Sequence, residues 1–256
     1  MTAVPAFTTL GGGPTVLMLH GIGGGHLAFA PQVETLATAG YRAVAWDMPG
    51  YGHSAPIEPY TFKGLAASCI QLIEALKCEQ VILLGHSMGG LIASTFVQRD
   101  MARVDGLVLS SPALDAGLSR FQRLLLDVLP RIAPNLTVGN GLEVHAISHD
   151  PEVVRAYQAD PRVHGRISGR LARFIADGGP AVVAQASHWH VPTLLMYAGS
   201  DRLVNPAGSR AFAQAAPPAV VESDCFEPLF HEIFNEPEEM AAPVFERLQA
   251  WLDQRF

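Results

Sequence analysis

Short apolar runs alternate with amphipathic stretches along most of the chain. The runs are rich in Val, Leu and Ile, are bounded by Gly, Pro or Asp, and cover residues 14–20, 41–47, 80–86, 104–111 and 191–200, with a weaker one at 219–225. Helical patterns separate them, over about residues 27–39, 60–77, 88–99, 206–215 and 237–254. Apolar strands that alternate with helices are typical of a parallel sheet covered on both faces. The pattern therefore predicts an α/β fold with a mostly parallel, doubly wound sheet.

One connection between the predicted strands is much longer than the others. About 80 residues separate Ser111 from the strand that begins near Val191, which is too many for a simple crossover. Helical segments are predicted inside it at 121–129, at 150–159 beginning with Asp150 and Pro151, and at 165–177, with Gly178 and Gly179 ending the last and Pro180 starting another. Such an insert would cover the carboxyl edge of the sheet, where open α/β sheets place their sites. We expect one domain, residues 1–256, with a helical cap at about 115–188.

Composition and charge exclude several classes of function. The chain has 49% hydrophobic and 16% charged residues, a net charge of -7, and no basic stripe for a nucleic acid. The three cysteines have no metal-ligand spacing and predict no disulfide framework. Because the chain starts without a signal-like segment and contains no apolar run of about 20 residues, we expect a cytoplasmic protein.

The strongest motif is Gly-His-Ser-Met-Gly-Gly at residues 85–90, which follows an apolar strand and precedes a helical pattern. A serine between glycines on a sharp strand-to-helix turn projects its hydroxyl clear of the backbone, and larger neighbours would collide there. The motif therefore predicts that Ser87 is a nucleophile.

A serine hydroxyl needs a base, and that base needs an orienting acid. Asp201 directly follows a predicted strand, and His231 lies between the last strand and the C-terminal helix. The chain order Ser87, Asp201, His231 is the order of the triad in hydrolases built around a nucleophile elbow. Asp115 and, more weakly, Asp224 are alternative acids, whereas we interpret His86 as structural. We interpret His188 and His190 as packing between cap and sheet, since no third ligand at metal spacing accompanies them.

Ester cleavage also requires hydrogen-bond donors for an oxyanion. The backbone N–H of Met88 is one candidate, and the N–H of Ile22, in the glycine-rich loop after the first predicted strand, is the other. That loop lacks the glycine and lysine spacing of a phosphate-binding loop, so we do not interpret it as a phosphate cradle.

With these residues in place, the chain resembles the α/β-hydrolase superfamily over essentially its whole length. The motifs that carry the resemblance are HGIGGG (20–25), DMPGYGHS (47–54), GHSMGG (85–90), GSDRLV (199–204) and the C-terminal histidine. The second half is similar to bacterial monoacylglycerol lipases and lysophospholipase-like enzymes, notably at 109–114, 146–165, 192–212 and 226–238. The resemblance implies a helical cap, an apolar acyl tunnel, and hydrolysis of a fatty acyl ester of glycerol or a similar alcohol, without a cofactor.

The first half departs from that pattern. Such lipases usually carry a Glu-His pair shortly after the first His-Gly and a D-H-R-G-H-G-x-S segment, whereas this chain has HGIGGGHLAF and DMPGYGHS. These segments look more like small-molecule carboxylesterases, lactonases and C–C bond hydrolases, which remain the alternative. About 13 residues precede the first predicted strand, so we expect the sheet to lack an edge strand that many relatives have.

The expected partner is a small-molecule or lipid ester, without nucleic acid. The apolar stripe of the segment 121–129 either packs inside the cap or makes transient contact with lipid aggregates.

Overall fold

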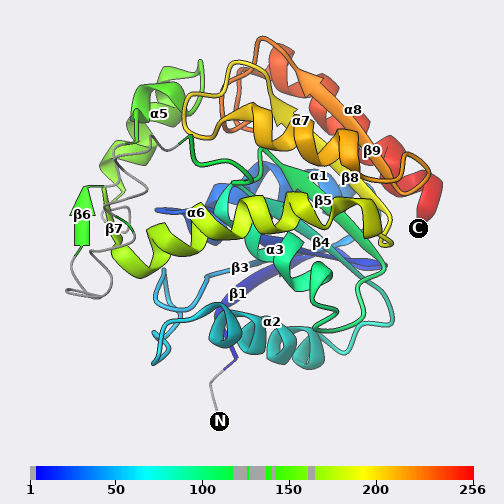
Figure 1. The fold of residues 1–256 in the computed structure, drawn as a ribbon. Coiled ribbons are helices and arrows are strands. Elements are labelled where there is room, and N and C mark those ends of the chain that lie inside the picture. Colours follow the sequence, from blue (N-terminus) through cyan, green and yellow to red (C-terminus); the bar gives the residue numbers. More distant parts are fainter. Residues whose placement is uncertain (1–3, 118–125, 127–136, 140–141, 161–164) are drawn as a thin grey trace.

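The computed structural model describes residues 4–117, 126, 137–139, 142–160 and 165–256. Within these residues, seven strands form one sheet in the order β1-β3-β2-β4-β5-β8-β9 (Figure 1). Their bounds are Phe7–Leu10 (β1), Thr15–Leu19 (β2), Arg42–Trp46 (β3), Val81–His86 (β4), Gly106–Ser110 (β5), Thr193–Ala198 (β8) and Val221–Phe226 (β9). β1 runs antiparallel to β3, and the other pairs are parallel.

Helices cover both faces of this sheet (Figure 1). α1 (Ala30–Thr38) and α8 (Glu238–Arg255) pack on one face, while α2 (Phe62–Leu76), α3 (Met88–Gln98) and α7 (Pro206–Ala215) pack on the other. Successive strand residues point to opposite faces, so Leu83 joins the α2 and α3 side and Leu84 joins the α1 and α8 side. This two-sided burial explains why the strands are continuously apolar in the sequence.

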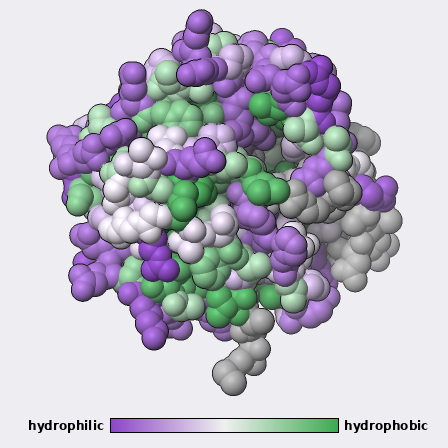
Figure 2. Space-filling model, turned by 180° about the vertical axis from the view of Figure 1, so that it is seen from behind, coloured by the Kyte–Doolittle hydropathy of each residue, from purple (hydrophilic) through white to green (hydrophobic). Residues whose placement is uncertain are grey.

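The fold class predicted from the sequence is confirmed: the chain has the α/β-hydrolase fold, with an open and mostly parallel sheet. Every predicted strand and each of the five sheet-packing helices is present, with bounds that shift by a few residues. The segment before the first predicted strand contains β1, a short edge strand that the sequence pattern did not predict. Phe7 and Leu10 of β1 stay exposed. Seen from behind, apolar and polar groups are interspersed over the surface (Figure 2).

The segment between β5 and β8 contains the predicted helical insert in part. Its described elements are β6 (Thr137–Gly139), η2 (Val144–Ala146), α5 (Pro151–Ala159), β7 (Arg166–Ser168), α6 (Gly169–Ala184) and η3 (Ala186–His188). Asp150 caps α5 as predicted, because its side chain accepts a hydrogen bond from the Glu152 N–H at 2.8 Å. Apart from Leu126, the predicted helix at 121–129 lies outside the described residues.

The prediction that a helix ends at Gly178 was wrong. α6 continues through Gly178, Gly179 and Pro180 to Ala184. A Cβ on Gly179 would lie 2.2 Å from the Leu114 carbonyl oxygen, so the missing side chain lets α6 approach the segment after β5 closely. Tertiary packing outweighs the local preference of these residues to stop a helix.

Candidate active site

Ser87 occupies the sharp turn between β4 and α3. Its backbone has φ 55° and ψ -121°, a region that residues with a Cβ rarely adopt. The Ser87 N–H donates to the Ser110 carbonyl at 3.0 Å, which ties the turn to β5. Neighbouring glycines are required by space: a Cβ on Gly85 would meet Gly89 at 2.6 Å, and one on Gly89 would meet the Leu19 oxygen at 1.9 Å. The glycine spacing read from the sequence therefore has the predicted steric origin.

Asp201 and His231 come together from loops that follow β8 and β9. His231 Nδ1 donates to Asp201 Oδ2 at 2.7 Å, and both side chains are buried. The other carboxylate oxygen, Oδ1, accepts the backbone N–H groups of Leu203 and Val204 at 2.8 and 3.0 Å. Five-membered ring geometry then leaves His231 Nε2 facing the cavity, with the tautomer fixed by the acid.

The environment of His231 sets its proton affinity. Burial disfavours the charged ring, but the charge and hydrogen bond of Asp201, together with the charge of Glu232, outweigh that effect. The pKa of His231 is therefore raised above 6.5. A ring that gains a proton readily is suited to act as a general base.

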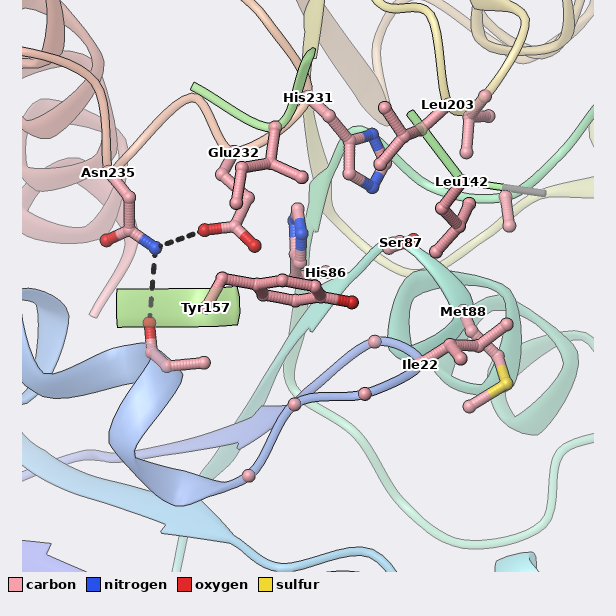
Figure 3. Close-up of a pocket in the computed structure, with 18 of the residues that line it drawn as sticks. Ile22, His86, Ser87, Met88, Leu142, Tyr157, Leu203, His231, Glu232 and Asn235 are labelled. Atoms are coloured by element: carbon pink, nitrogen blue, oxygen red, sulfur yellow. Dashed lines mark hydrogen bonds between the residues drawn. The ribbon is translucent and has the colours of Figure 1, made fainter. Parts of the chain in front are cut away.

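Ser87 and His231 line the same cavity, which has a volume of about 550 Å³ (Figure 3). The His86 ring lies beside His231, with centroids 4.9 Å apart, and its Nδ1 lies 3.2 Å from the Ser110 hydroxyl. Burial lowers the pKa of His86 well below 6.5, so this ring is neutral. His86 therefore adds no positive charge beside the His231 imidazole.

Ile22 and Met88 lie together on another side of the cavity (Figure 3). Met88 is the first residue of α3, so its N–H has no partner in a preceding helical turn. A Cβ on Gly21 would lie 2.9 Å from the Ser87 Cβ, which shows how closely the Ile22 loop approaches the elbow. The structure thus brings both predicted donors to the same cavity as Ser87.

His20 holds the Ile22 loop in place. Its Nδ1 donates to the Gly21 carbonyl at 2.8 Å, and its Nε2 accepts the Met48 N–H at 3.0 Å. The ring is buried, which lowers the pKa of His20 to about 4 and keeps it neutral with the proton on Nδ1. This role was not predicted from the sequence, although His20 begins the HGIGGG motif.

A second set of hydrogen bonds, around the buried Asp47, holds the loops beside the cavity. Its Oδ1 accepts both the backbone N–H and the ring Nδ1 of His26 at 2.9 Å, and its Oδ2 accepts the His53 N–H at 3.0 Å. The His53 ring also lies 3.5 Å from Oδ2. These three side chains offer ligand atoms within 4.8 Å of one another, close enough for a metal ion. Their internal hydrogen bonds give them a structural role, because they join the loops after β2 and β3.

The alternative acids and histidines serve elsewhere. Asp115 accepts from the Asn205 side chain at 2.8 Å, and Asp224 accepts from Arg247 at 2.7 Å. His188 and His190 are exposed, so the prediction that they pack between cap and sheet was wrong. The exposed position follows from their place at the end of η3, before the chain enters β8.

The cavity wall is mostly apolar, with one polar region. Apolar side chains come from the loops around the elbow and from the insert, among them Leu27, Leu142, Ile147, Val153, Ile167, Ile175, Leu203 and Val204. Tyr157, Glu232 and Asn235 add polar groups on one side (Figure 3). Sequence reasoning missed these three, and the one available signal was that Glu232 adjoins the predicted base.

Comparisons with known proteins agree with this geometry. The family model described as serine aminopeptidase, S33, matches residues 14–238. The monoacylglycerol lipase of Mycolicibacterium smegmatis is 31% identical over 252 residues, 93% of this chain and 87% of that protein. Phospholipase YtpA of Bacillus subtilis is also 31% identical, over 93% of this chain and 95% of that protein.

A solved structure gives the same result. The crystal structure of Paleococcus ferrophilus monoacylglycerol lipase matches with a TM-score of 0.89 and 30% identity, covering 98% of this chain and 99% of that one. In the part of the chain that the structure describes, no helix has the length and apolar character to cross a membrane. The family match extends from β2 to the start of α8 and includes Ser87, Asp201 and His231. The chain therefore belongs to the serine aminopeptidase S33 family of α/β-hydrolases.

Proposed function

We propose that this protein hydrolyses monoacylglycerols through an acyl-enzyme on Ser87. The observation that carries the proposal is the cavity itself, which is lined by Ser87, His231 and a mostly apolar wall. An apolar wall suits a hydrocarbon chain, because binding is stabilised by about 25 cal/mol for each Å² of apolar surface removed from water. The similarity to monoacylglycerol lipases supports the same substrate class.

The geometry supports a two-step acyl transfer. His231 Nε2 takes the proton of the Ser87 hydroxyl as its oxygen attacks the ester carbonyl, while Asp201 stabilises the imidazolium. The N–H groups of Ile22 and Met88 donate to the oxyanion, and each such donor contributes about 3 kcal/mol of transition-state stabilisation. His231 then protonates the leaving alcohol, and water repeats the sequence on the acyl-enzyme.

The insert acts as the cap in this proposal. Residues at about 115–188 supply Ile147, Val153, Ile167 and Ile175 to the cavity, so acyl selectivity depends on them. Contact of the segment 121–129 with lipid aggregates concerns residues that, apart from Leu126, lie outside those described.

Substrate profiling with a labelled nucleophile tests the proposal. We expect a fluorophosphonate to modify Ser87 alone, detected by peptide mass spectrometry, and Ser87→Ala to lose turnover and labelling together. Wild-type kcat/KM for a monoacylglycerol of medium or long chain should exceed that for monoacetylglycerol, which has the same leaving alcohol, and for a lysophospholipid. Faster cleavage of the short ester would favour the small-molecule esterase suggested by the first half of the sequence. Turnover retained by Ser87→Ala would exclude the mechanism.

A further inference from the structure

A polar wall lies on one side of the cavity, beside the base. Glu232 directly follows His231, and its carboxylate enters the same cavity (Figure 3). Glu232 Oε2 accepts from the Asn235 side chain at 2.8 Å, and that amide also reaches the Ala28 carbonyl at 3.4 Å. Among the described residues, nothing donates a hydrogen bond to Glu232 Oε1. One oxygen of a half-buried carboxylate is therefore open to the cavity.

Backbone hydrogen bonds hold the residue that carries this carboxylate. The Glu232 N–H donates to the Ile147 carbonyl at 2.8 Å, and the Asn235 N–H donates to the Glu232 carbonyl at 2.8 Å. Burial raises the pKa of Glu232, which means that the protein holds the group where water solvates it poorly. A polar group in such a place costs free energy unless it finds a partner. Asp201 already orients His231, so the triad does not require Glu232 for that task.

The cavity has two different sides about the nucleophile. Glu232 and Asn235 lie on one side of Ser87 and His231, whereas Leu142 and Leu203 lie on the other (Figure 3). The Tyr157 ring extends across the space between, with its hydroxyl directed toward Ser87 (Figure 3). An ester bound at Ser87 must direct its acyl part and its alcohol part away from the carbonyl in different directions. Hydrocarbon suits the leucine side, and hydrogen-bond donors suit the carboxylate side.

We propose that Glu232, held by Asn235, determines alcohol specificity by accepting hydrogen bonds from the free hydroxyls of a polyol leaving group. The wall of Glu232, Asn235 and Tyr157 is then the alcohol subsite, and the side of Leu142 and Leu203 receives the acyl chain. This inference rests on the proposed function, because it assigns the two halves of the same substrate. It predicts that esters of glycerol are preferred over esters of the same acid with a simple alcohol.

A purely electrostatic role for Glu232 makes a different prediction. Its charge contributes to the raised pKa of His231, so any loss of the carboxylate changes the base for every ester alike. The subsite acts only on substrates whose alcohol carries hydroxyls. The ratio of two kcat/KM values, for esters that share one acyl group, separates these roles because the change in the base cancels.

The first experiment measures that ratio with monooctanoylglycerol and ethyl octanoate below their aggregation concentrations. The variants are Glu232→Leu, which removes the acceptor, and Glu232→Gln, which keeps an amide oxygen. Glu34→Leu on the exposed side of α1 is the matched control. Hydrogen bonds to a charged group contribute about 1.5–3 kcal/mol, so Glu232→Leu should lower the ratio about 10- to 100-fold. Glu232→Gln should fall in between, and Glu34→Leu should match the wild type.

The second experiment tests glycerol binding at the alcohol subsite without a glyceride substrate. p-Nitrophenyl octanoate forms the acyl-enzyme, and added glycerol competes with water for it. A glycerol hydroxyl attacks the acyl carbon, its proton passes through His231 to the Ser87 oxygen, and the Ser87 ester bond breaks as monooctanoylglycerol forms. Wild-type enzyme should transfer more acyl group to glycerol than to equimolar ethanol, and Glu232→Leu should lose most of that preference.

The outcomes distinguish the two proposals. A ratio and a glycerol preference that Glu232→Leu leaves unchanged, in a variant whose Ser87 still reacts with a fluorophosphonate, would overturn the subsite. If the wild type does not cleave monooctanoylglycerol, the proposed function fails, and transfer to glycerol still decides the subsite. A shifted pH profile with an unchanged ratio would leave Glu232 an electrostatic role only and would also overturn it.

Discussion

Replacing His20 by Asn tests how the loop that carries Ile22 is held. His20 is buried and neutral, with Nδ1–H on the Gly21 carbonyl and Nε2 on the Met48 N–H. An asparagine amide can still donate to the Gly21 carbonyl, but it does not titrate and leaves the Met48 N–H without its acceptor. A buried donor without a partner costs about 1–3 kcal/mol, so the variant should be less stable at neutral pH.

The pKa of His20 gives the pH dependence of this difference. Burial, opposed only in part by the Gly21 hydrogen bond and by Asp47, lowers the pKa from 6.5 to about 4. The unfolded chain therefore binds a proton below pH 6.5 that the native protein refuses until about pH 4. The His20 contribution is complete above pH 6.5 and is lost as the pH falls, by about 3 kcal/mol in total and about 2 kcal/mol at pH 5.

Urea unfolding at pH 7.5 and pH 5, at one ionic strength, measures the effect. The stability gap between wild type and His20→Asn should narrow by about 2 kcal/mol on acidification, because only the wild type loses the His20 contribution. His190→Asn, which alters an exposed ring, is the control variant. If the stability gap between wild type and His20→Asn is equally wide at both pH values, His20 is not the buried, neutral ring that holds the Ile22 loop.

Three further predictions concern the elbow, the acid and α6. Ser87→Gly should lose turnover yet unfold at a higher temperature, with about 1 kcal/mol of added stability. The reason is that glycine relieves the backbone strain of φ 55° and ψ -121°. A lower melting temperature would count against strain at this turn. Asp201→Asn should reduce kcat by about 10⁴-fold. It should also move the acid limb of the kcat/KM profile, which lies above pH 6.5 in the wild type, to lower pH, because the imidazolium loses its counter-charge. An acid limb that stays in place would show that a group other than His231 titrates there. Gly179→Ala should destabilise the fold by well over 1 kcal/mol, because its Cβ would lie 2.2 Å from the Leu114 carbonyl oxygen. The Cβ of Gly178→Ala would instead meet the Leu91 side chain at 3.3 Å, so this variant should be neutral or stabilising. Equal melting temperatures of the two alanine variants would contradict the packing argument for α6.

Local sequence spacing predicted much of the geometry of the candidate site, because that geometry depends on short segments. The elbow needs Ser87 between two glycines at a strand end, and those positions are adjacent in the chain. Asp201 could be predicted to lie at the site because it follows a strand that ends at the carboxyl edge of the sheet. The strands were predictable for a similar reason, since burial on both faces makes them continuously apolar.

Features that depend on distant contacts could not be predicted in the same way. Gly179 and Pro180 favour a helix end locally, and only the approach of the Leu114 backbone explains why α6 continues. β1 is mostly exposed and has four residues, so its pairing with β3 left little periodic signal. The partners of His20 at Met48 and of Glu232 at Asn235 required the folded geometry.

The departure of the first half from the lipase pattern now has a structural counterpart. The resembling lipases carry a Glu-His pair after the first His-Gly, whereas in this chain the histidine at that point, His26, bonds to Asp47 and clamps the loop. A carboxylate beside His231 comes instead from the opposite loop, as Glu232, and Asn235 links it to the carbonyl of Ala28, two residues beyond His26. One loop thus supplies both the proposed base, His231, and the group proposed to bind the alcohol. Because these residues are neighbours in the chain, a change of alcohol preference through Glu232 should also alter the pH dependence of the base.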